Sequence, residues 1–194
     1  SSKGYDIFGS AILKILDKFK DWRACAIGNE KRETHNFTHK NFTVIDWLPH
    51  EKILNYYKKS SISVACSRWE EPFGRTAMES AAYGCATITS NRGGLGETFN
   101  NNLILEDLNS STLEKLISKI IRNKKLLKKK QKNNFMNVLH KISFLADKID
   151  NLKGNFLNNK INYIRNKNLK ILHISTFDEK NDHRLFNISI ANKL

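Results

Sequence analysis

Short apolar segments alternate with amphipathic ones over the first hundred residues, and this alternation constrains the fold more than any other feature. The apolar segments are short and mostly rich in β-branched residues, as β-strands are, and cover residues 22–27, 42–47, 62–66, 86–90 and 103–105. Helical spacing of apolar residues marks 5–20, 50–58 and 76–83. Because strands that alternate with helices form right-handed crossovers, the sequence predicts an α/β fold, a Rossmann-like parallel sheet with helices on both faces.

The second half of the chain has a different pattern. Residues 112–122 predict a helix that starts at a serine or threonine cap, with Glu114 near the third position. A helical stretch then runs to about residue 149, and residues 151–168 predict a linker or a loosely packed helix. In the tail, residues 169–175 predict a strand and 184–194 a helix. The tail is either the start of a second α/β unit, which we favour because the preceding segment is long, or a last strand at the edge of the first sheet. The sequence thus predicts that the chain has three parts, residues 1–122, 123–168 and 169–194.

The net charge of +14 requires an explanation, since much of it lies in residues 122–132. One reading is a solvated helical face in a lysine- and asparagine-rich chain, and another is a surface for anionic inner-membrane lipids. Nucleic-acid binding is the least favoured reading, because no aromatic residues are interleaved with these lysines. No stretch approaches the roughly 18 to 20 apolar residues that span a bilayer, and the first residues lack the apolar run of a signal peptide. We therefore expect a cytoplasmic protein. If the lysines form a surface for anionic lipids, the protein would also contact the inner membrane peripherally.

The cysteines and histidines show no pattern of a metal site. The three cysteines, Cys25, Cys66 and Cys85, fall in or beside apolar segments, which is typical of reduced core thiols in a cytosolic protein. The alternative is that one of them is a catalytic thiol, but no cysteine has a histidine near it in sequence. His35 and His39 are four residues apart in a polar loop, where solvated side chains are expected more often than metal ligands. We expect no metal and no cofactor.

The segment from Glu71 to Glu79 places two carboxylates around a glycine turn, between the strand at 62–66 and the helix at 76–83. The start of that helix should carry unpaired N–H groups at about Phe73, Gly74 and Arg75, together with the positive end of the helix dipole. The carboxyl ends of parallel strands are where ligands bind in such sheets. The segment therefore predicts an anion site with a hydroxyl-binding acid on either side, which suits a phosphorylated sugar.

In this context the chain resembles the C-terminal, donor-binding domain of retaining glycosyltransferases of the GT-B architecture, the large "group 1" family that uses nucleotide-sugar donors. The acid pair Glu71 and Glu79, with its proline–phenylalanine–glycine turn, resembles the signature of that family. Three further turns agree in order and context: Lys3-Gly4-Tyr5-Asp6 before the first helix, Leu48-Pro49-His50-Glu51 under the nucleotide base, and the second glycine turn at Ser90-Asn91-Arg92-Gly93-Gly94. The resemblance covers about residues 3–106.

The resemblance implies a role for each matching residue. Glu71, as the catalytic residue, would approach the donor sugar near its anomeric carbon, and Glu79 would hydrogen-bond the ribose. Lys3 would neutralise the diphosphate leaving group, helped by the main-chain N–H groups of Phe73, Gly74 and Arg75. Fixed cations and N–H groups aimed at a departing diphosphate stabilise the transition state more than the ground state. The implied activity is transfer of a sugar, with retention, from a nucleotide-diphosphate donor to a saccharide or lipid-linked acceptor in polysaccharide or lipopolysaccharide synthesis.

The chain also departs from the family pattern. It begins at the lysine–glycine turn, so the strand that precedes this turn and the acceptor-binding N-terminal domain do not lie in these 194 residues. A sheet without that strand has an unpaired edge, so we expect the isolated chain to be poorly soluble and inactive in transfer. The alternative function is a non-catalytic nucleotide-binding or interaction module of the same fold, in which the two acids only cap a helix.

Overall fold

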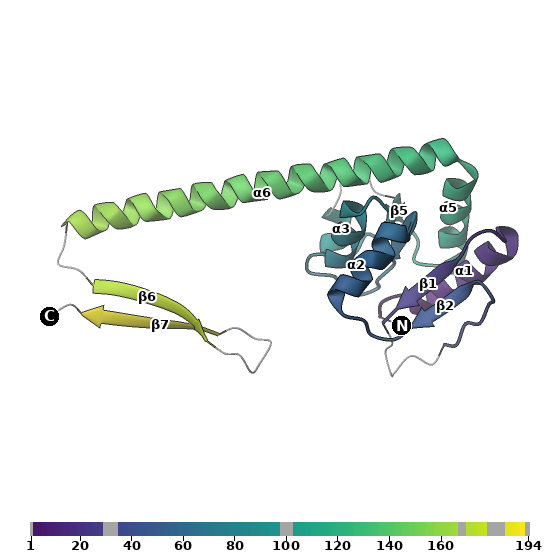
Figure 1. Ribbon diagram of the computed structural model, residues 1–194, viewed down its shortest axis with the longest axis horizontal. Coiled ribbons are helices and arrows are strands. Elements are labelled where there is room, and N and C mark those ends of the chain that lie inside the picture. The colour runs from purple at the N-terminus through teal and green to yellow at the C-terminus, as the bar shows by residue number, and fades with distance from the viewer. Residues whose placement is uncertain (1, 29–34, 98–102, 167–169, 178–184, 193–194) are drawn as a thin grey trace. The chain divides into compact units, whose positions relative to one another are not determined.

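The structure is a computed structural model that describes residues 2–28, 35–97, 103–166, 170–177 and 185–192, with side-chain surroundings up to residue 155 except at 141 and 145 (Figure 1). The chain divides into two compact units, Ser1–Ser143 and Phe144–Leu194. Most of the segment 29–38, namely residues 29–34, lies outside the described residues.

The first unit alternates strands and helices as predicted. Its elements in chain order are α1 (Tyr5–Lys18), β1 (Ala24–Ile27), β2 (Phe42–Ile45), α2 (His50–Lys59), β3 (Ile62–Ala65), α3 (Arg75–Ala82), β4 (Ala86–Ser90), α4 (Gly94–Glu97), β5 (Leu103–Leu105) and α5 (Ser110–Arg122). Every strand pair in this unit is parallel: β1 with β2, β3 with β4, and β4 with β5. The predicted α/β class is confirmed, and the predicted strands at 86–90 and 103–105 match β4 and β5 residue for residue.

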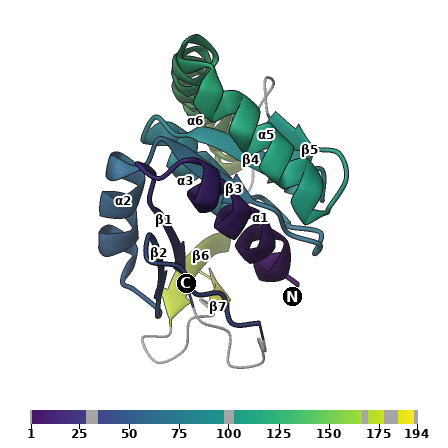
Figure 2. The same ribbon diagram turned by 90° about the vertical axis from the view of Figure 1, so that its right-hand side faces the viewer.

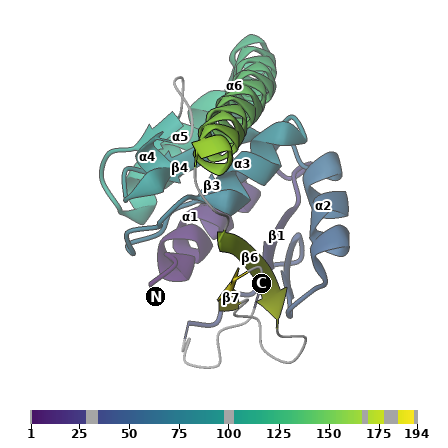
Figure 3. The same ribbon diagram turned by 90° about the vertical axis from the view of Figure 1, so that its left-hand side faces the viewer.

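Helices cover both faces of the strands. Figure 2 shows α1 and α5 on the side nearer the viewer, and Figure 3, from the opposite side, shows α3 there. The larger core lies under α1 and α5, where Ile15, Leu16, Leu113 and Ile120 are almost completely buried together with Ile88 of β4. An ion pair of 2.5 Å between Lys18 and Glu114 joins the two helices at the surface. The α5 helix is capped by Asn109, whose side chain accepts from the Thr112 N–H, so the predicted serine or threonine cap is wrong.

A smaller core lies under α3, where Ala77 and Ala81 pack with Leu95 of α4 and Val138 of α6 (Lys124–Asn166). Small side chains on α3 allow this close approach. Asn134, also fully buried on α6, donates to the carbonyl of Cys85 at 3.1 Å and so connects the start of α6 to the end of the α3–β4 turn. The lysine-rich run therefore forms the first turns of a helix that packs on the first unit with its other face.

The strands of the first unit fall into two sheets, one of β1 and β2 and one of β3, β4 and β5. Among the described residues, β1 pairs only with β2, and β3 pairs only with β4 on one side. All four residues of β1 and of β3 are partly exposed, whereas all five residues of β4 are buried. The two strands that should be central in a doubly wound sheet thus have the burial of edge strands.

The second half of α6 and the tail differ from parts of the prediction. Residues 151–166 are helical, so of the two alternatives for 151–168 the helix is the one observed and the linker is wrong; the stretch has no proline to break the helix. β6 (Lys170–Phe177) confirms the predicted strand at 169–175, with residue 169 outside the described part. The helix predicted at 184–194 is wrong, because β7 (Leu185–Asn192) is a strand antiparallel to β6. Phe186, Ile188 and Ile190 alternate with polar Asn187 and Ser189, a period of two that outweighs the helical spacing.

Candidate functional site

The segment before α1 is bound to the loop that follows β3. The carbonyl oxygen of Ser2 accepts from the N–H groups of Arg68 and Trp69, at 2.9 and 3.3 Å. Gly4 has φ +76° and is the N-cap of α1, and a Cβ atom built on it would lie 2.1 Å from the carbonyl oxygen of Cys66. Only glycine allows this approach, so the lysine–glycine turn is held directly above the carboxyl end of β3.

The guanidinium of Arg68 holds the carboxylate of Asp6, in the first turn of α1, through two hydrogen bonds of 2.7 Å each. This bidentate pair lowers the pKa of Asp6 well below its usual range, and the hydrogen bond to Arg68 is the largest cause. The pair fixes the start of α1, and with it Lys3, against the β3 loop.

Replacing Arg68 with alanine is expected to lower the free energy of unfolding by about 1 kcal/mol at pH 7. The pKa of Asp6 is lower in the folded state than its unfolded value of about 3.9, so this stabilisation is present above that pH and is lost as the pH falls below it. The difference between the parent and the variant in urea denaturation should therefore narrow as the pH falls below about 3.9 and should disappear only below the folded-state pKa of Asp6. Arg92→Ala is the matched control, because Arg92 makes a single 3.2 Å contact with an exposed Glu70. An equal loss in both variants would contradict the role of the bidentate pair.

Two residues predicted for the site, Lys3 and Glu71, form an ion pair. They are 68 positions apart in the sequence. The side chain of Lys3 is 61% exposed and that of Glu71 only 21%. The pair therefore has an open side at Lys3, from which an anion can reach the ammonium group.

The second glycine turn packs against the backbone of Glu71. Gly93 forms a parallel bridge with Glu71, and the N–H of Gly94 donates to the Glu71 carbonyl at 2.6 Å. A Cβ atom at Gly94 would lie 2.7 Å from the carbonyl oxygen of Pro72. The hydroxyl of Ser90 also donates to the Ser67 carbonyl at 2.7 Å. The loops after β3 and β4 thus form one layer at the carboxyl edge of the strands.

The α3 helix starts at Arg75, one residue before the predicted start, with Gly74 as its N-cap in the left-handed region and no side-chain cap. The N–H groups of Arg75 and Thr76 have no hydrogen-bond partner among the described residues. The Gly74 N–H has no partner in this part of the chain either, so two of the three predicted donors, Gly74 and Arg75, are open, while the half-exposed Phe73 has an interaction of its own. An uncapped helix start next to Lys3 and Glu71 is suited to bind an anion.

Glu79 lies further along α3 and contacts two basic side chains. Its Oε1 atom lies 3.0 Å from Nε2 of His50, at the start of α2, and 3.3 Å from Nε of Arg75. His50 belongs to a turn that matches the family pattern, but the resemblance implies no role for its side chain. Tyr57 lies two turns after His50 on α2; burial and, second, the charge of Glu79 raise the pKa of Tyr57 to about 12. Glu79 therefore accepts a hydrogen bond from Arg75 and lies beside the imidazole of His50.

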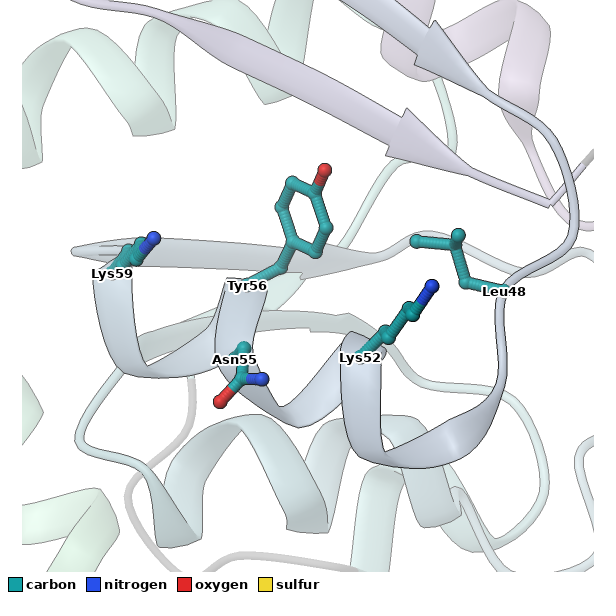
Figure 4. A pocket seen from close by; sticks show the side chains of 5 residues that line it. All are labelled: Leu48, Lys52, Asn55, Tyr56 and Lys59. Carbon is teal, nitrogen blue, oxygen red and sulfur yellow. The ribbon is translucent and has the colours of Figure 1, made fainter.

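A hollow of about 420 Å³ lies on another face of α2 (Figure 4). It is lined by Leu48, Lys52, Asn55, Tyr56 and Lys59. Because Lys52, Tyr56 and Lys59 are four and three residues apart, they share a face of α2 that differs from the face of His50 and Tyr57. None of the predicted site residues lines this hollow, so it is separate from the acid pair.

The cysteines are free, and Cys66 and Cys85 are buried as predicted. Burial raises the pKa of each of these two thiols to about 11, so both stay protonated at neutral pH and are poor nucleophiles. The part of the chain that the structure describes has no cluster of three potential metal ligands. Within those same residues, no helix is long and apolar enough to pass through a membrane.

The chain is similar to a known family over most of its length. The family model described as "Glycosyl transferases group 1" matches residues 1–135. A curated relative, the putative glycosyltransferase YtcC of Bacillus subtilis, is 32% identical over 91 residues, which are 45% of this chain and 22% of that protein. The chain spans about a fifth to a third of the curated relatives it matches.

Solved structures share the fold. The C-terminal domain of the group 1 glycosyl transferase LpcC from Francisella tularensis has a TM-score of 0.66 at 25% identity, over 73% of this chain and 80% of that one. Anabaena Alr3699/HepE, solved in complex with UDP-glucose, has a TM-score of 0.60 at 14% identity, over 77% of this chain and 46% of that one. The first match covers most of a domain, and the second shows the fold alone.

Proposed function

Since this chain belongs to the group 1 glycosyltransferases, we propose that it binds the nucleotide-diphosphate sugar from which such an enzyme transfers a hexose. The observation that supports this most strongly is the ion pair between Lys3 and Glu71 beside the uncapped start of α3. It combines a cation for a diphosphate, N–H groups for its oxygens and a carboxylate for sugar hydroxyls at one edge of the strands.

In the proposed reaction the diphosphate of the donor replaces Glu71 as the ion-pair partner of Lys3. The leaving diphosphate gains negative charge as the bond to the anomeric carbon breaks, and the Lys3 ammonium together with the N–H groups of Arg75 and Thr76 would stabilise that charge. Glu71, released from Lys3, would accept hydrogen bonds from the sugar and stabilise the positive charge that develops on its ring. Phe73 and Gly74 would form the wall of the turn that faces the sugar.

On the nucleoside side, the Glu79 carboxylate would accept hydrogen bonds from the two ribose hydroxyls. We propose that transfer proceeds with retention and needs no resident metal, because Lys3 and the helix start would supply the positive charge. The acceptor would be a saccharide or a lipid-linked sugar in cell-surface polysaccharide or lipopolysaccharide synthesis. The exposed lysines of α6, such as Lys128 and Lys129, would give a cytoplasmic enzyme weak contact with anionic inner-membrane lipids.

The split between the two sheets supports a further part of the proposal. A doubly wound sheet has the strand order 3-2-1-4-5-6. The observed order fits this as β2, β1, one further strand, β3, β4 and β5, with the further strand between the half-buried β1 and β3. A strand preceding Lys3 in a longer protein would take that place. Expressed alone, the 194 residues should be poorly soluble and transfer no sugar; measurable transfer by this chain would contradict this.

Titration with uridine, guanosine and adenosine diphosphates tests the proposed function. The chain, kept in solution as a fusion to a carrier protein, and a version extended by an N-terminal strand should bind one diphosphate in a saturable way. Lys3→Ala should weaken this binding about 10-fold or more, as expected for the loss of a charged hydrogen bond. Lys20→Ala is the control, since Lys20 pairs with an exposed Asp17 on the surface of α1. Saturation by none of the three, even in the extended version, would contradict the proposed function and leave an interaction module that binds no nucleotide.

A further inference from the structure

Glu79 is held on one side only. Both basic contacts, from His50 and from Arg75, fall on the same oxygen, Oε1. The other oxygen, Oε2, accepts no hydrogen bond from the described residues, and the Glu79 side chain is 21% exposed. The carboxylate is therefore turned so that one oxygen is anchored in the protein and the other is left for a ligand.

The two anchors come from different elements. Arg75 lies one helical turn before Glu79 on α3, so its contact is local and its side chain is 73% exposed. His50 is the first residue of α2 and reaches Glu79 across the boundary between the two helices. A glutamate side chain has three torsions, and a contact from a second element restricts them more than a neighbour on the same helix does.

We propose that His50 is a positioning residue for the donor nucleotide: it holds Oε1 of Glu79 so that Oε2 faces the ribose hydroxyls. This inference rests on the proposed function, and it assigns to the site a residue that contacts the ribose only through Glu79. The benefit is preorganisation, because a carboxylate that is already ordered loses less conformational freedom when the nucleotide binds.

The test uses the 194-residue chain as the carrier fusion, with the nucleoside diphosphate that binds tightest in the titration above and its 2′,3′-dideoxy counterpart. His50→Ala should weaken binding of the ribose form about two- to tenfold, the range expected for ordering one flexible side chain. It should leave binding of the dideoxy form unchanged. His50→Gln, which keeps an N–H donor, should restore most of the affinity. Lys52→Ala is the control on the other face of α2 and should change neither ligand.

A double variant completes the test. In a chain that already carries Glu79→Ala, His50→Ala should cause no further loss, because the residue acts through Glu79. An equal loss for the ribose and dideoxy forms, an additive loss in the double variant, or no effect of His50→Ala would each overturn the inference while leaving the proposed function in place. Failure of the parent chain to bind any diphosphate would overturn both.

Discussion

Replacing Glu79 with alanine is expected to lower the affinity of the chain for its nucleoside diphosphate by about 10- to 100-fold. Hydrogen bonds to a charged group contribute about 1.5–3 kcal/mol each, and the variant removes the carboxylate that would accept from the ribose. The loss is expected whichever of the three diphosphates the chain binds, because the ribose is common to them. Isothermal titration calorimetry or ligand-observed NMR measures it.

The control is Asp21→Ala. Asp21 is an exposed acid before β1, at the end of the strands opposite the site, so its removal changes the net charge by the same amount without removing a ribose acceptor. It is expected to leave affinity within about twofold, as for most surface substitutions. If Glu79→Ala weakened binding no more than Asp21→Ala does, the assignment of Glu79 to the ribose would be wrong.

Gly4→Ala is expected to lower the free energy of unfolding by about 3 kcal/mol, through left-handed strain of about 1–2 kcal/mol and overpacking of about 1–3 kcal/mol. Gly4 has φ +76°, and the added Cβ would lie 2.1 Å from the Cys66 carbonyl oxygen. Relief of the clash requires the start of α1 to move away from the β3 loop, which would also separate Lys3 from Glu71. Urea denaturation followed by tryptophan fluorescence measures the stability, and the titration above measures the loss of diphosphate affinity.

Gly84→Ala separates the two causes. Gly84 has φ +81°, close to that of Gly4, but a Cβ atom there would have no neighbour within 4 Å. Gly84→Ala should lower the free energy of unfolding by about 1 kcal/mol, the part that comes from left-handed strain, and should leave the diphosphate affinity unchanged. Equal destabilisation of the two variants would mean that the Cys66 carbonyl moves aside at little cost.

The fold of the first unit followed from the sequence because each strand there is short, apolar and bounded by clear turns. The boundaries of β4 and β5 were predicted to the residue, and the pairing of the acid motif with a glycine-started helix was correct apart from one residue at its beginning. The tail was less predictable. Residues 184–194 fit both periods, and the antiparallel pairing with β6 that decides between them is a non-local contact.

The site was predictable in its parts but not in its connections. The Lys3–Glu71 pair joins two residues that the sequence had singled out separately. His50 could be found only from the packing of α2 against α3, since histidine at a helix start has many uses. The pair of Asp6 with Arg68 was likewise missed, because no local spacing relates two residues 62 positions apart.

The close contact between Gly93–Gly94 and the backbone of Glu71 and Pro72 bears on attempts to alter donor preference. The main chains of the two loops touch at 2.6 Å, so a foreign sequence placed in only one loop would not fit against the other. A chimera that receives residues 66–74 from another transferase would keep its shape only if residues 90–97 came from the same source. Residues 66–74 and 90–97 of this chain would therefore have to be exchanged together.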